Sequence, residues 1–172
     1  MKWIELLRAD LSRYPRNAFL REQSAWAVAV YRWGQNIHQW PAGFTRRALE
    51  PLYWLAYRTV ETLTGCSFSK AVKIGPGLRI HHFGGIFIHD SARIGSNCTL
   101  RQGVTIGNRF PGGGVPEVGD DVEFGAYAQV LGDIKVGSGA KIGAMAVVIR
   151  DVPSGATVVG IPARVVKTRA PR

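Results

Sequence analysis

Cysteine is scarce in this 172-residue sequence, which contains only Cys66 and Cys98. The two cysteines do not form a C-x-x-C pair and have no histidine cluster beside them, so neither a disulfide framework nor a metal site is expected. Cys98 is expected to be a small core residue, and a reducing, cytoplasmic location is the default expectation. The first residues, MKWIELLRADLSRYP, carry acids and lack an apolar core, so they do not resemble a signal peptide.

Acidic side chains are also scarce, with 12 Asp and Glu against 22 Lys and Arg and a formal net charge of +10. Such an excess favours an anionic partner, for example nucleic acid, a phosphate-rich cofactor or a membrane surface. The excess is spread along the chain: nine basic and five acidic residues precede Gly65, giving +4, and thirteen and seven follow it, giving +6. Because the charge is dispersed, no nucleic-acid partner is expected.

Long apolar runs are lacking, since SAWAVAVY and LYWLAY are far shorter than the roughly 18 residues that a membrane-spanning helix needs. Tryptophan is lacking after Gly65, and all five tryptophans precede it: Trp3, Trp26, Trp33, Trp40 and Trp54. Helices packing on the rest of the chain or on a neighbouring subunit are the favoured explanation. Peripheral contact with the inner face of the membrane remains the main alternative.

After Gly65 the sequence repeats with a period of six residues, the hexapeptide pattern of a parallel β-helix. The large residues of the repeat are Phe68, Ile74, Ile80, Ile86, Ile94, Leu100, Ile106, Val118, Phe124, Val130, Val136, Ile142 and Val148. A series of mostly small residues follows four positions later: Val72, Leu78, Gly84, Ala92, Cys98, Val104, Val122, Ala128, Ile134, Ala140, Ala146 and Val152. Glycines directly after the large residues predict corners with unusual dihedrals or close backbone approach.

Before Gly65 the signals are helical. The stretch EPLYWLAYRTVETLTG has Pro51 suited to a first helical position and Gly65 placed as a stop. An apolar stripe runs along it: Leu52, Leu55, Ala56, Val60 and Leu63. A second helix is predicted over REQSAWAVAVYRWGQ. The chain is therefore divided into a helical segment, residues 1–65, and a β-helix domain, residues 66–172.

The sequence resembles the serine acetyltransferase branch of the left-handed β-helix acyltransferases. The likeness rests on KIGPGLRIHHFGGIFIHDSARIGSNCTLRQGVTIGNR, on the closing stretch DVPSGATVVGIPARVVK and on the helical entry LLRADLSRYPRNAF. It implies a mainly β fold, a left-handed coil with an N-terminal helical segment, and a homotrimer with active sites between adjacent prisms. It also implies acetyl-CoA as the acetyl donor. The residues proposed to bind that donor are Gly107, Asn108, Ala126, Ala144, Arg164 and Lys167.

Within IHHFGG, His82 lies on the family's catalytic position and His81 lies where an aspartate would be. His82 is therefore the predicted general base, because a hydroxyl is a poor nucleophile until a base removes its proton. His81 and Asp90 are the predicted acceptor-binding residues. Ser67 occupies the position of the family's orienting carboxylate. The Ser67 hydroxyl, a backbone carbonyl, Asp90 and Glu61 remain open as groups that orient His82.

The charged groups that would bind an amino acid in the family are also replaced, by Tyr14, His81 and the stretch 114–116 of the loop 108–117. A zwitterion without ion pairs would bind weakly, so a sugar hydroxyl on a polysaccharide precursor is the expected acceptor. RQGVTIGNR is similar to text in colanic-acid and exopolysaccharide O-acetyltransferases, which favours the same acceptor. A serine O-acetyltransferase and a catalytically inactive β-helix binding or scaffold module remain as alternatives.

Overall fold

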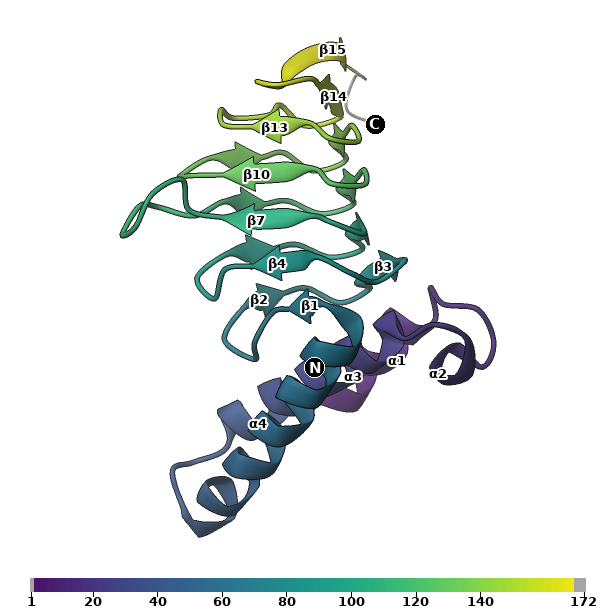
Figure 1. Ribbon diagram of the computed structural model, residues 1–172, viewed down its shortest axis with the longest axis vertical. Helices are drawn as coiled ribbons and strands as arrows, with labels where there is room; N and C mark the ends of the chain where they lie inside the picture. The colour runs from purple at the N-terminus through teal and green to yellow at the C-terminus, as the bar shows by residue number, and fades with distance from the viewer. Residues whose placement is uncertain (1, 169–172) are drawn as a thin grey trace.

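The structure is a computed structural model that describes residues 2–168, and in it four helices are followed by a column of short strands (Figure 1). The helices are α1 (Trp3–Leu11), α2 (Ala18–Arg21), α3 (Ser24–Gln39) and α4 (Phe44–Thr64). They gather at one end of the column, and the last strands lie at the other end. The helix predicted over 21–35 corresponds to α3, which ends before Pro41.

The strands form three sheets that the chain visits in turn, so that each of the first four circuits of the column adds one strand to each sheet. The first sheet contains β1 (Cys66–Ser67), β4 (Ile86–Ile88), β7 (Thr105–Gly107), β10 (Gln129–Leu131) and β13 (Val147–Val148). The second contains β2 (Lys73–Ile74), β5 (Arg93–Ile94), β8 (Glu117–Val118) and β11 (Lys135–Val136). The third contains β3 (Arg79–His81), β6 (Thr99–Arg101), β9 (Glu123–Phe124), β12 (Lys141–Ile142), β14 (Ala156–Val159) and β15 (Arg164–Thr168).

Neighbouring strands within the three sheets are parallel, except that β15 pairs antiparallel with β14. All thirteen large residues of the repeat are buried, and every small residue of the second series is buried except Gly84. Each buried aliphatic side chain of this kind contributes about 1.5–3 kcal/mol. The predicted mainly β parallel solenoid with a helical N-terminal segment is confirmed, and Cys98 is a fully buried core residue.

The glycines after the large residues allow successive coils to approach closely. A Cβ placed on Gly137 would lie 2.4 Å from the backbone nitrogen of Ser154 in the next coil. Gly137 does not have a positive φ, so of the two expected reasons for these glycines, close approach is the one that applies there.

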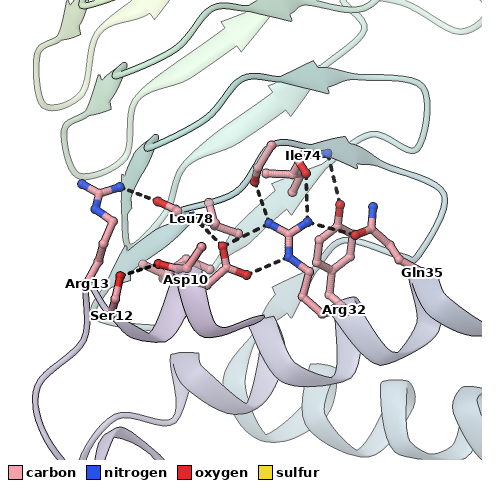
Figure 2. A network of polar contacts seen from close by, with 12 residues as sticks. Asp10, Ser12, Arg13, Arg32, Gln35, Ile74 and Leu78 are labelled. Carbon is pink, nitrogen blue, oxygen red and sulfur yellow. Dashed lines mark hydrogen bonds and ion pairs between the residues drawn. The ribbon is translucent and has the colours of Figure 1, made fainter. Parts of the chain in front are cut away.

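The helices cover the open end of the solenoid, where β1, β2 and β3 are edge strands. Edge strands present backbone groups without partners in their own sheet. Figure 2 shows how α1 and α3 supply these partners: Arg32 donates to the carbonyl oxygens of Ile74 (2.9 Å) and Gly75 (2.6 Å). Asp10 pairs with Arg32 at 2.7 Å and accepts a hydrogen bond from the Leu78 N–H at 2.8 Å. Both side chains of this ion pair are fully buried.

Tyrosines complete this polar cap. The Tyr31 hydroxyl donates to the Val72 carbonyl (2.9 Å) and accepts from the Ile74 N–H (3.1 Å). Two further tyrosine hydroxyls accept hydrogen bonds from backbone N–H groups, Tyr14 from Ile80 and Tyr53 from Lys70. The helical segment therefore satisfies the edge of the first coil mainly through side-chain hydrogen bonds.

One prediction for α4 is wrong. The helix begins at Phe44, so Pro51 lies inside it and not at its start. Much of the apolar stripe is exposed in the single chain, since Leu52, Leu55 and Leu63 are 51%, 66% and 61% exposed. The buried residues of α4 include Tyr53, which accepts a hydrogen bond from the Lys70 N–H of the solenoid, and Tyr57, whose hydroxyl contacts the side chains of Glu61 and Ser67. The predicted stop at Gly65 is confirmed by its left-handed conformation.

Several tryptophans pack against other residues of the helical segment to which they belong. Trp33 and Trp54 meet the ring of Tyr53 edge-on, with centroids 6.2 and 5.2 Å away. The indole N–H of Trp26 donates to the Phe19 carbonyl at 2.8 Å. None of the helices in residues 2–168 is long and apolar enough to cross a membrane. Membrane contact by this segment stays a prediction.

Candidate active site

The double histidine lies at a corner of the solenoid between β3 and β4. His81 is the last residue of β3, and His82 follows with a φ of 60°, a left-handed conformation that side chains other than glycine adopt rarely. Gly84 and Gly85 continue the turn with φ of 110° and 65°. The His82 side chain is exposed at this corner, where a reacting hydroxyl can reach it.

A cavity of about 360 Å³ adjoins both histidines. Its lining residues are Arg79, His81, His82 and Phe83 from the solenoid and residues 21–24 from the helical segment. This volume is at the lower end of the range for small-molecule sites. The cavity forms between the two parts of the chain, so the site depends on how the helices dock.

An ion pair between Glu22 and Arg79 forms part of the cavity wall. The two guanidinium nitrogens of Arg79 donate to the two carboxylate oxygens of Glu22 at 2.5 and 2.9 Å. Arg79 is buried and its guanidinium lies 3.9 Å from the centre of the Tyr14 ring. The hydrogen bonds from Arg79 lower the pKa of Glu22, and the charges of His81 and His82 lower it further. Sequence reasoning missed both residues, because they are 57 positions apart and carry no motif.

Ser67 lies in β1, and its hydroxyl is 3.4 Å from the hydroxyl of Tyr57. Tyr57 donates in turn to Glu61 at 3.0 Å, and Arg58 pairs with Glu61 at 2.7 Å. Ser67 and Glu61, two of the predicted orienting groups, thus belong to one network on α4. Neither of them forms a hydrogen bond with the His82 ring within residues 2–168, so the group that orients His82 stays a prediction.

Asp90, predicted to bind the acceptor, lies just after β4, beyond the end of the strand remote from His82. It accepts a hydrogen bond from Ser69 at 2.7 Å and does not line the cavity beside the histidines. Within one chain, the structure therefore brings His81 together with His82 and leaves Asp90 apart. The reason is that a whole strand of the first sheet separates the two corners.

Gln102 lies on the coil next to His82, because it follows Arg101, the partner of His81 in β6. Its side-chain oxygen is the one buried side-chain nitrogen or oxygen in residues 2–168 without a hydrogen-bond partner. An unpaired buried acceptor costs about 1–3 kcal/mol. No motif in the sequence singled out Gln102.

The residues proposed to bind the donor fall at separate places. Ala126 and Ala144 lie at successive corners between the third and first sheets, linked by the hydrogen bond from the Met145 N–H to the Ala126 carbonyl (2.8 Å). This column of corners starts at His82. Gly107 and Asn108 lie at the other end of the first sheet, where Gly107 faces His89. One chain does not bring the two sets together.

Arg164 and Lys167 are exposed on β15, in the coil farthest from the helices (Figure 1). Lys167 shares a hollow of about 270 Å³ with Lys141 and Thr157. Lys141, which was not singled out from the sequence, also pairs with Glu123 at 2.8 Å. Residues 2–168 contain no group of three or more His, Cys, Asp or Glu side chains placed to hold a metal ion.

Known proteins similar to this chain narrow the choice of acceptor. The family described as "Bacterial transferase hexapeptide (six repeats)" matches residues 116–150. The serine acetyltransferase of Helicobacter pylori (strain ATCC 700392 / 26695) is 39% identical over 142 residues, which cover 81% of this chain and 79% of that protein. This chain belongs to the serine acetyltransferase family.

Other members of the serine acetyltransferase family are similar over much of the chain. That of Mycobacterium tuberculosis is 38% identical over 141 residues, 81% of this chain, but the match spans only 60% of its own length. The structure of the Neisseria gonorrhoeae serine acetyltransferase superposes with a TM-score of 0.83 at 29% identity, covering 99% of this chain and 67% of that one. Soybean serine acetyltransferase complexed with serine gives 0.79 at 32% identity, covering 96% and 68%.

These relatives overturn the preference for a sugar acceptor. The matching members of the serine acetyltransferase family are named for serine, so the predicted closeness to colanic-acid enzymes is not supported. The prediction rested on the charged groups replaced at Tyr14, His81 and the stretch 114–116 and on the likeness of RQGVTIGNR to exopolysaccharide enzymes. The cavity contains a different charged pair, Glu22 and Arg79, which the sequence did not reveal.

Proposed function

We propose that this chain transfers an acetyl group from acetyl-CoA to the hydroxyl of serine, with His82 as the general base. The observation that supports this most directly is the exposed His82 at a corner beside a small cavity with charged walls. The names of the relatives support serine as the acceptor. The proposal concerns a chain that spans 60% to 79% of two of those relatives.

In this reaction, a ring nitrogen of His82 accepts the hydroxyl proton while the oxygen attacks the thioester carbon. The tetrahedral intermediate then collapses, the carbon–sulfur bond breaks, and His82 returns the proton to the sulfur of the CoA leaving group. The products are the O-acetyl ester and the free thiol. A general base of this kind contributes about 10²–10⁴ in rate.

Acetyl-CoA would use part of the positive charge of the chain, because it carries several phosphate groups. The small residues Ala126 and Ala144 leave room for a slender arm beside the column of corners that starts at His82. Lys167, with Lys141 beside it, offers ammonium groups to a phosphate. In the proposed homotrimer, an adjacent prism would supply the corner with Gly107 and Asn108. The two sets of residues proposed to bind acetyl-CoA would then lie in one site.

The test is release of free thiol from acetyl-CoA by the purified protein in the presence of L-serine. Changing His82→Ala should lower kcat by about 100-fold or more while the Kd for acetyl-CoA is retained. His38→Ala is the matched control, because His38 is an exposed histidine on α3 outside the cavity, and it should leave turnover unchanged. Absence of turnover with any small hydroxyl acceptor, together with absence of acetyl-CoA binding, would favour the scaffold alternative.

A further inference from the structure

The hydrogen-bond donors of Arg79 are almost fully used, and their directions constrain His81. Nη1 donates to Glu22 (2.5 Å) and to the Ile80 carbonyl (2.9 Å). Nη2 donates to Glu22 (2.9 Å) and faces Nδ1 of His81 at 3.4 Å. The stacking of the guanidinium on Tyr14 holds it in this place. Arg79 therefore has little freedom to turn toward a ligand.

A guanidinium has only donors, so the nitrogen that faces it must act as an acceptor. Nδ1 of His81 consequently carries the lone pair, and in the neutral ring the proton is on Nε2. A proton on Nδ1 would be directed at the hydrogens of Arg79. The geometry thus selects one tautomer of His81.

The surrounding charges keep His81 neutral near pH 7. Burial lowers its pKa most, and Arg79 on the same strand and Arg101 on β6 lower it further. His82 at the corner acts in the same direction, whereas Glu22 from the helical segment acts against it. A neutral His81 with its proton on Nε2 is a hydrogen-bond donor, whereas an aspartate in its place would be an acceptor.

The cavity beside His81 has a net positive lining, with Arg21 and Arg79 against Glu22 as its charged side chains. We propose that Glu22 and Arg79 are positioning residues that hold His81 as an Nε2–H donor to the carboxylate of the acceptor. This deepens the proposed function, on which it rests for the identity of the acceptor. It assigns carboxylate recognition to a neutral histidine supported by an ion pair that bridges the helical segment and the solenoid.

Histidine side-chain NMR tests the positioning without any turnover. In ¹⁵N-labelled protein, with the His81 signals assigned by their loss in His81→Asn, wild-type His81 should be the Nε2–H tautomer. Arg79→Met keeps an apolar stem over Tyr14 but removes the charge, so the pKa of His81 should rise and the Nδ1–H form should appear. Glu22→Gln keeps the size of the side chain and one acceptor oxygen but removes the negative charge, so the pKa of His81 should fall.

These opposite shifts cannot arise from a general loosening of the fold, which would move both variants the same way. Circular dichroism checks that each variant folds, and Glu22→Gln serves alone if Arg79→Met does not. Wild-type His81 in the Nδ1–H form, or a titration of His81 that neither variant changes, would overturn the proposal.

Kinetics test the recognised group. Arg79→Met should raise KM for L-serine about tenfold with little change in kcat. A tenfold rise corresponds to the loss of one hydrogen bond to a charged group, here the bond from His81 to the carboxylate. The variant should leave KM for L-serinamide, which lacks the carboxylate, unchanged. An equal rise for both acceptors would refute carboxylate recognition. If the wild type acetylates neither, the proposed function has failed, while the NMR result still decides whether Glu22 and Arg79 position His81.

Discussion

In the solenoid, the deepest side chains are aliphatic and follow the repeat, whereas in the helical segment they include Asp10, Arg32 and Tyr31. The difference follows from what each part packs against. Within the solenoid, each coil packs on a neighbouring coil, and hydrogen bonds between their parallel strands already pair the backbone groups. Only apolar side chains are therefore needed to fill the space inside the coils. The helices pack on the edge of the first coil, whose backbone groups have no partners until polar side chains supply them.

The largest expected effect is at the centre of the polar cap. Asp10→Ala leaves Arg32 charged and buried and leaves the Leu78 N–H without its partner. The free energy of unfolding should fall by about 3–5 kcal/mol, measured by chemical denaturation at fixed protein concentration. The double change Asp10→Leu with Arg32→Met removes the unpaired charge but leaves the Leu78 N–H and the Ile74 and Gly75 carbonyls without these partners, so it should not restore stability. A loss below about 1 kcal/mol for Asp10→Ala would mean that water reaches Arg32.

This difference also decides how much the sequence could predict. The repeat gives the solenoid almost completely, because each coil contacts only its neighbours and the period alone specifies what is buried. Asp10 and Arg32 could not be paired from the sequence, because nothing local distinguishes them from the other charged residues of an amphipathic helix. Their roles depend on which end of the solenoid the helices reach.

The residues of the candidate active site also differ in how far the sequence could predict them. His82 was predicted because the local stretch IHHFGG resembles the family's catalytic stretch, and the structure places His82 at an exposed corner. Glu22 and Arg79 were missed because they meet only after the helical segment docks. The wrong choice of acceptor rested on the motif positions alone, and these did not include Glu22 and Arg79.

The second prediction tests whether buried apolar side chains stabilise the interior of the solenoid. Leu100 is fully buried between coils, and Leu100→Ala should lower the free energy of unfolding by about 3 kcal/mol through lost burial and the cavity that remains. Leu100→Met keeps the volume and should cost less than about 1.5 kcal/mol. Thermal or urea unfolding followed by circular dichroism measures both. Equal losses for the two variants would show that shape matters more than buried volume.

The third prediction removes one hydroxyl from the polar cap. Tyr31→Phe leaves the Ile74 N–H without a partner, whereas the Val72 carbonyl keeps the hydrogen bond from Gln35 at 3.3 Å. The expected loss of stability is about 1–2 kcal/mol, the cost of one unsatisfied buried donor. Tyr127→Phe is the control, because Tyr127 is 57% exposed at a solenoid corner and should change stability little. Matching effects at both sites would contradict the special role of the edge.

The smallest effect is expected on the outer face of α4. Leu55 belongs to the apolar stripe of α4 and is 66% exposed, whereas Tyr53 on the same helix is fully buried. Leucine and glutamine are both good helix formers, so Leu55→Gln should change the free energy of unfolding by less than about 0.5 kcal/mol. Denaturation at several protein concentrations measures this. A loss of several kcal/mol that depends on concentration would mean that a second copy covers this face, so that the stripe is core in the assembly. A loss that does not depend on concentration would mean that α4 packs within its own chain through its leucines, and the contrast between a polar cap and an apolar solenoid would fail.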